Sequence, residues 1–196
     1  MTKRNSSSVL LTAAMALAVF GATPAHAQLL GTTVTGNLSL PGNNSNFFDP
    51  ANGFVPSSGY SNSTGGTTVT VAEPAIEFGF ASGNILTITA NITATQLILT
   101  EVINNVDSPA GFTMTLNDTS FGTPVLVSNT FPSGFSFSKT GNIITVNGPA
   151  NSTNGTYQAT LNVAATAVPE SGSGVLALLA ASGSLFVAKL RRRKTA

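Results

Sequence analysis

Carboxylates are the side chains with which this chain could most readily do acid–base chemistry. Glu73 and Glu77 are its one close pair of glutamates. On an extended strand they share a face but stand roughly 13 Å apart, whereas the two carboxylates of a glycosidase are about 5 to 9.5 Å apart. Pro74 could bend the segment and shorten the distance, or a second carboxylate could come from elsewhere in the fold. We favour a solvated edge strand over a hydrolytic site here.

The side chains that other common kinds of catalysis require are missing from the central part of the chain. The chain has no cysteine and no tryptophan, and its single histidine, His26, lies in the N-terminal segment. Disulfides, zinc sites, cysteine nucleophiles and serine–histidine–aspartate triads are therefore excluded from residues 28–167. Few groups there titrate near neutral pH, so we expect no catalytic site, and we predict that the protein is not an enzyme.

The charge of the central part is acidic, although the whole chain carries +1. Between Gln28 and Val168, Lys139 is the one base, against six acids, which leaves a net charge of −5. Nucleic-acid binding requires clustered lysine and arginine. We therefore expect no nucleic-acid partner.

A segment rich in glycine, asparagine, serine and proline covers residues 41–66. Loops of this length are uncommon inside a domain unless they are functional. Asp49 and its neighbours offer the oxygen ligands that calcium takes, although one carboxylate and no EF-hand spacing favour an ordinary loop of Asx turns. We expect no other metal or cofactor. The neighbouring asparagines are Asn43, Asn44, Asn46 and Asn52.

Four aromatic residues lie in the same segment and could form a platform for sugar rings. They are Phe47, Phe48, Phe54 and Tyr60. Loop aromatics more often fold back to cap a core, and sugar platforms favour tryptophan and tyrosine, of which residues 28–167 have no tryptophan and two tyrosines. If a ligand binds, we expect it at Phe47, Phe48, Asp49 and Tyr60 in this loop.

The elements that must position these residues are β-strands. Large apolar residues alternate with threonine, serine and asparagine, the pattern of antiparallel strands with one solvated face. Glycine- and asparagine-rich turns separate the runs. The alternating apolar positions are Val34, Leu38 and Leu40; Ile76, Phe78 and Phe80; Leu86, Ile88, Ala90 and Ile92; Phe112, Met114 and Leu116; Phe135 and Phe137; Ile144 and Val146; and Tyr157, Ala159, Leu161 and Val163.

Eight or nine short strands at this spacing predict an all-β fold, an antiparallel β-sandwich of immunoglobulin-like or jelly-roll type. The alternation loses phase at residues 93–100, where we expect a bulge or a strand that passes between the sheets. No helical period appears before the C-terminal segment.

Both ends of the chain carry targeting patterns. Lys3 and Arg4 precede an apolar stretch at residues 9–20, and Ala25-His26-Ala27 follows before Gln28. This order is typical of a secretory signal peptide. We therefore predict a signal helix in residues 1–27, cleavage between Ala27 and Gln28, and the general secretion machinery and signal peptidase as partners. The β-sandwich domain then occupies residues 28–167.

Residues 168–196 form the C-terminal segment. An apolar run predicts a short transmembrane helix at residues 174–190, and its part at 175–190 would be roughly 24 Å long, shorter than a hydrocarbon core of about 30 Å. A basic cluster at residues 189–194 predicts a stop-transfer signal that holds the C-terminus in the cytoplasm. Its members are Lys189, Arg191, Arg192, Arg193 and Lys194.

The motif Val168-Pro169-Glu170, followed by this apolar run and basic cluster, resembles the PEP-CTERM sorting tail of bacteria with double membranes. Ser171 stands where the family has a second proline, so the motif spans residues 168–171. The resemblance implies that an exosortase recognises Pro169 and Glu170 and removes the tail. It also implies a transient hold in the inner membrane, then release to the outer surface or exterior. A plain permanent anchor is the alternative.

The resemblance associates such cargo with exopolysaccharide and biofilm matrices, so extracellular polysaccharide is an expected partner. We expect a structural or adhesive role. The second hypothesis is a secreted carbohydrate-binding module that uses the 41–66 loop, and the third is a secreted polysaccharide-active enzyme.

Overall fold

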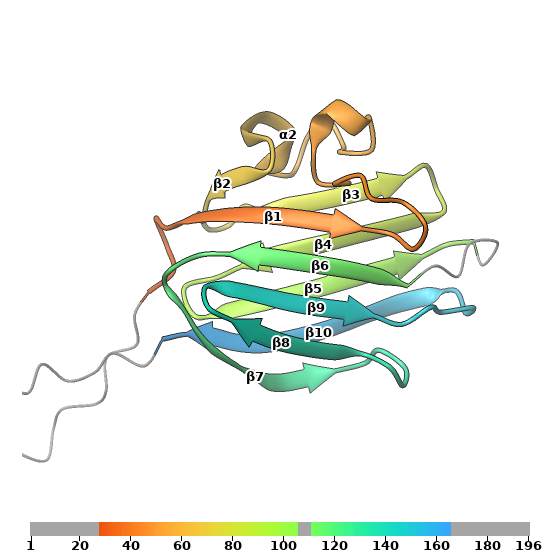
Figure 1. Ribbon diagram of the computed structural model, residues 1–196. Helices are drawn as coiled ribbons and strands as arrows, with labels where there is room; N and C mark the ends of the chain where they lie inside the picture. Colours follow the sequence, from red (N-terminus) through yellow and green to blue (C-terminus); the bar gives the residue numbers. More distant parts are fainter. Residues whose placement is uncertain (1–27, 106–110, 166–196) are drawn as a thin grey trace, which may run out of the picture. The chain divides into compact units, whose positions relative to one another are not determined.

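The computed structural model describes residues 28–105 and 111–165, and these form β-strands with two short helical turns (Figure 1). The turns are the 3-10 helix η1 (Pro50–Asn52) and the helix α2 (Asn62–Gly65). The ten strands are β1 (Thr33–Ser39), β2 (Thr68–Thr70), β3 (Phe78–Ser82), β4 (Leu86–Ile92), β5 (Gln96–Ile103), β6 (Phe112–Asn117), β7 (Phe121–Asn129), β8 (Ser136–Thr140), β9 (Ile143–Gly148) and β10 (Gly155–Ala164).

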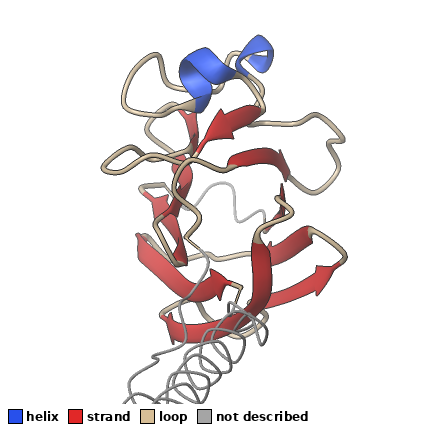
Figure 2. Ribbon diagram, turned by 90° about the vertical axis from the view of Figure 1, so that its left-hand side faces the viewer, coloured by secondary structure: helices blue, strands red, loops and turns tan. Residues whose placement is uncertain are grey.

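The strands pair into two five-stranded antiparallel sheets. One has the order β2-β1-β6-β9-β8 and the other β3-β4-β5-β10-β7. Figure 1 shows one sheet in front of the other, with β2 and β3 at the upper edges and β7 and β8 at the lower edges. Figure 2 shows both helical turns above the upper edges. This arrangement is consistent with the predicted all-β sandwich.

One hydrophobic core lies between the sheets and takes residues from both. β4 and β5 alternate strictly between buried and half-buried positions, because successive side chains of a strand point to opposite faces. Each fully buried leucine, isoleucine or phenylalanine contributes about 1.5 to 3 kcal/mol. The largest fully buried side chains of the strands are Leu38, Phe78, Phe80, Ile88, Ile92, Leu97, Leu99, Met114, Leu116 and Ile144.

The expected irregularity at residues 93–100 is a tight turn, so the prediction of a bulge or a crossing strand was wrong. The Thr93 amide donates to the Gln96 carbonyl at 2.8 Å, and the Thr93 hydroxyl accepts from the Gln96 amide at 3.1 Å. The turn resets the phase, and β5 then alternates cleanly with Leu97 and Leu99 inward. The described bulges lie instead in the pairing of β7 with β10.

Strand β7 has no counterpart in the predicted pattern. Its residues Val125, Leu126 and Val127 are consecutive apolar residues, so they show no alternation, and Pro124 precedes them. The strand forms an edge of its sheet, where Val125 is 59% exposed and Val127 57% exposed. An edge strand tolerates such a sequence because only one side of it pairs.

Two further expectations concern helices. The turns η1 and α2 lie within residues 41–66, in the part of the chain where the sequence shows no helical period. Both are too short to show a helical period in the sequence. Among the described residues, no helix has the length and apolarity needed to span a bilayer. The predicted signal helix and the predicted transmembrane helix at 174–190 lie outside the described residues.

Candidate functional site

The 41–66 loop is fastened to the sheet by a buried asparagine. The Asn62 side-chain amide donates to the Phe48 carbonyl at 3.0 Å and to the Gly79 carbonyl at 3.1 Å. Its side-chain oxygen accepts from the Gly79 amide at 3.0 Å. One side chain thus joins the loop to β3 and satisfies buried backbone groups that would otherwise lack partners.

Two of the predicted ligand-binding aromatics belong to the core. Phe48 stacks on Phe78 with ring centroids 5.0 Å apart, and Phe47 packs edge-on against Phe80 at 5.3 Å. Both loop rings are buried, so Phe47 and Phe48 do not form the exposed platform that was one of the two alternatives. The two rings instead cap the core, which was the other alternative. They cover the apolar side chains that β3 presents beside the loop.

The other aromatics of the loop keep part of their surface. Phe54 is 39% exposed and contacts Phe47 at 5.4 Å between ring centroids. The ring of half-buried Tyr60 lies against Gly79 of β3. A Cβ atom at position 79 would collide with this ring, so the close contact requires glycine. A pocket of about 260 Å³ opens between Phe47, Phe54 and Phe80. A ligand could still enter the loop here.

Asp49, Asn43 and Asn46 use their side-chain oxygens to bind backbone amides of the loop and of β1. The Asp49 carboxylate caps η1 by accepting from the Ala51 amide at 2.9 Å. The Asn46 side-chain oxygen accepts from the Leu38 and Phe48 amides, each at 3.0 Å. The Asn43 side-chain oxygen accepts from the Ser45 amide at 2.9 Å. These are the Asx turns of the favoured interpretation, and calcium binding stays a prediction.

Glu77 is buried, which corrects the prediction that Glu73 and Glu77 lie on a solvated edge strand. The Glu77 carboxylate accepts from the Ala72 amide at 3.1 Å and from the Ile92 amide at 2.7 Å. Burial raises its pKa, and these hydrogen bonds oppose that rise. Glu73 accepts from the Ala94 amide at 3.2 Å. Both carboxylates thus bind backbone amides and connect the segment before β3 to the end of β4.

A second buried carboxyl, Glu101, was missed as a candidate. Glu101 is 1% exposed, and its Oε2 atom has no hydrogen-bond partner among the described residues. In the sheet it pairs with Ile88 on β4 and Tyr157 on β10. Burial raises its pKa from 4.5 to about 7. The sequence indicates that Glu101 is buried, because alternate residues of a strand share a face and Glu101 therefore shares the inward face of Leu97 and Leu99.

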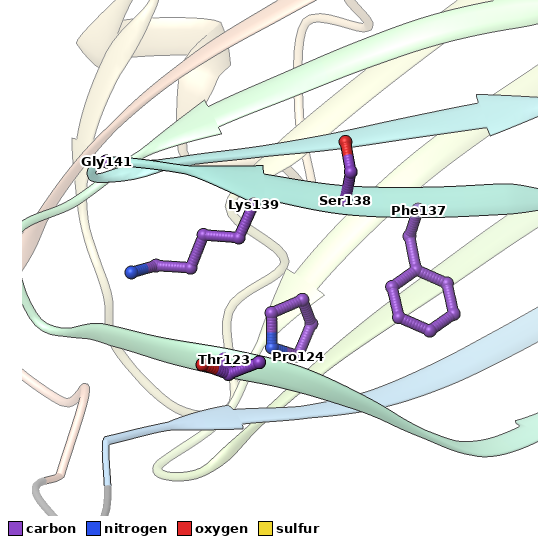
Figure 3. Close-up of a pocket in the computed structure, with 6 residues that line it drawn as sticks. All are labelled: Thr123, Pro124, Phe137, Ser138, Lys139 and Gly141. Carbon is purple, nitrogen blue, oxygen red and sulfur yellow. The ribbon is translucent and has the colours of Figure 1, made fainter.

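The pocket in Figure 3 lies between the edge strands β7 and β8 and has a volume of about 350 Å³. Thr123 and Pro124 line it from β7, whereas Phe137, Ser138 and Lys139 line it from β8, with Gly141 in the following turn. In Figure 3 the Phe137 and Lys139 side chains point toward β7, and the Ser138 hydroxyl points away from it. We call this site the edge pocket.

Register explains why Lys139 points into the edge pocket. Phe137 pairs with Val146 and Lys139 with Ile144, and both partners are buried core residues. Residues directly opposite each other on antiparallel strands share a face. The lysine therefore occupies the inward row of a strand at the open edge of the two sheets. The alternation Phe135-x-Phe137-x-Lys139 indicates this inward orientation of Lys139, but it was not recognised from the sequence.

An aromatic row closes the edge beside the pocket. Phe131 stacks on Phe135 with centroids 4.9 Å apart, and Phe135 lies 6.3 Å from Phe137. Phe131 also contacts Phe112 and Tyr157, so the row continues into the core. Phe137 is its last member and forms one wall of the edge pocket.

The chemistry available at the edge pocket is binding. Lys139 supplies an ammonium with three donors, Thr123 a hydroxyl, and Phe137 and Pro124 apolar ring faces. No family model, curated protein or solved structure matches the chain. The sorting motif Val168-Pro169-Glu170, the basic cluster and the Ala27–Gln28 cleavage site lie outside the described residues, apart from Gln28 itself.

Proposed function

We propose that the chain is an exported bacterial surface or extracellular-matrix protein with a structural or adhesive role in an exopolysaccharide or biofilm matrix. The general secretion machinery exports it, and an exosortase-type enzyme removes its tail after a transient hold in the inner membrane. The observation that carries the proposal is the order of residues 168–194: Pro169-Glu170, then an apolar run, then five basic residues.

The position of the domain supports this proposal. The last strand, β10, ends at Ala164, before the motif at residues 168–171. Cleavage at the motif would leave every described strand in the released protein. The charge left after both terminal segments are removed is −5 for residues 28–167, since one base stands against six acids. An acidic domain of this kind stays soluble outside the cell. We assign it to the immunoglobulin-like or jelly-roll type of sandwich.

Substitution at the motif tests the proposal. The double variant Pro169→Ala/Glu170→Ala should remain at full length in the membrane fraction, because the recognition pair is gone. Ser171→Ala is the matched control and should be processed like the wild type. Processing of the double variant at the wild-type rate would contradict the proposal, and a wild-type chain that stays in the membrane at full length would favour a permanent anchor.

A further inference from the structure

We propose that the edge pocket binds a carboxylated sugar of an acidic polysaccharide. The Lys139 ammonium holds the carboxylate, and the Phe137 ring lies against the apolar face of the sugar. The proposal rests on the proposed function, in which the domain lies within a polysaccharide matrix, and it names the chemistry of the sugar that the domain would hold.

The Lys139 side chain has no polar partner in the described part of the domain. Lys139 is the one base between Gln28 and Val168, and its ammonium makes no ion pair or hydrogen bond with any residue that the structure describes. Its side chain is half-buried against the pocket wall. An ammonium in such a place keeps its full capacity to bind an anion, because no carboxylate of the described part of the domain neutralises it.

The described carboxylates lie away from the edge pocket or are bound to other groups. Glu73 and Glu77 are bound beside β3, at the opposite edge of the sheets. Glu101 is enclosed in the core on the central strand β5. Asp118 lies nearer, where its amide bonds to Asn142, but it is buried and accepts from the Thr32 hydroxyl and the Ser120 amide. Asp49 caps η1 in the 41–66 loop, so the carboxylates of the described residues leave the edge pocket open to an anion.

The volume and lining of the edge pocket suit a sugar ring. Its volume of about 350 Å³ lies near the lower end of the range of roughly 300 to 1,000 Å³ for small-molecule sites. Apolar faces on Phe137 and Pro124, with the Thr123 hydroxyl nearby, suit a ring that has both C–H faces and hydroxyls. A single cation cannot neutralise a run of phosphates, so the lining favours a uronic acid over a nucleic acid.

Lys139 also admits a purely structural explanation. Inward-pointing charges on edge strands prevent edge-to-edge association of sheets. On that explanation, removal of the lysine would increase self-association and leave polysaccharide binding unchanged. The two explanations therefore make opposite predictions for one variant.

The test measures binding of the purified full chain in detergent to immobilised polygalacturonate by surface plasmon resonance. Fully methyl-esterified polygalacturonate is the uncharged comparison. The variant is the exchange Ser138→Lys/Lys139→Ser, which keeps the net charge and the strand but moves the ammonium to the outer face of β8. Should the exchange disturb the far-UV circular dichroism spectrum, Lys139→Gln replaces it, and Lys139→Arg is the conservative control.

We expect the wild type to bind the free acid roughly tenfold more tightly than the ester, and the exchange variant to lose that difference. Lys139→Arg should retain most of it. Equal binding of acid and ester by the wild type, or wild-type binding by the exchange variant, would overturn the inference, as would increased self-association with unchanged binding. Tail processing in cells is measured separately, so a processed chain that does not bind defeats this inference alone.

Discussion

The buried carboxyl of Glu101 makes the stability of the domain depend on pH. Its pKa rises from 4.5 in the unfolded chain to about 7 in the folded protein, because the side chain is desolvated between the sheets. The folded state therefore binds the proton more tightly. The resulting stabilisation is complete below the unfolded pKa of 4.5 and is lost as the pH rises through about 7. At about 1.4 kcal/mol per pH unit, the loss is about 3 kcal/mol.

Glu101→Gln removes the titration and keeps the shape of the side chain. Urea unfolding, followed by far-UV circular dichroism at about pH 4 and pH 8, gives the free energy of unfolding of both proteins. We expect similar values at about pH 4, and a variant more stable than the wild type by about 3 kcal/mol at pH 8. Glu101→Met, which is also uncharged, should remove the same pH dependence. Parallel pH profiles for wild type and Glu101→Gln would refute the reasoning.

The remaining predictions concern the 41–66 loop. Asn62→Ala should lower the free energy of unfolding by about 2 to 4 kcal/mol, because the Gly79 amide and two carbonyls lose their partner; exposed Asn44→Ala is the control, and equal unfolding midpoints in urea would contradict the anchoring role. Gly79→Ala should cost about 1 to 3 kcal/mol by pushing the Tyr60 ring off the strand. Thermal unfolding measures this loss, and an unchanged midpoint would show that the ring does not need the close contact.

Alternation in the sequence predicted the central strands because their buried faces require it. β1, β4, β6 and β9 lie where the apolar period indicates them. The sequence did not predict β7, because an edge strand with a bulged pairing does not need alternating apolar residues. The burial of Phe47 and Phe48 was one of two open alternatives, since the local sequence does not show that β3 passes beneath the loop.

The candidate site was harder to predict than the fold. Glu101 and Lys139 stand in the inward phase of their strands, and Glu77 is buried in the residue just before β3; charged side chains are rare at such positions. Their roles depend on what lies across the sheet. Backbone amides bind Glu77, whereas no described residue bonds to the Glu101 Oε2 atom. Lys139 points into the pocket between the edge strands β7 and β8. Those neighbours come from distant parts of the chain, so the sequence near each residue does not reveal them.

The most direct test of the proposed function is the intact mass of the protein recovered from the culture medium of a bacterium that has an exosortase. We predict a chain that begins at Gln28 and ends within residues 168–171, with any further mass due to attached sugar. A chain that is recovered only from membranes, at a mass that includes the C-terminal segment through Ala196, would contradict the proposal.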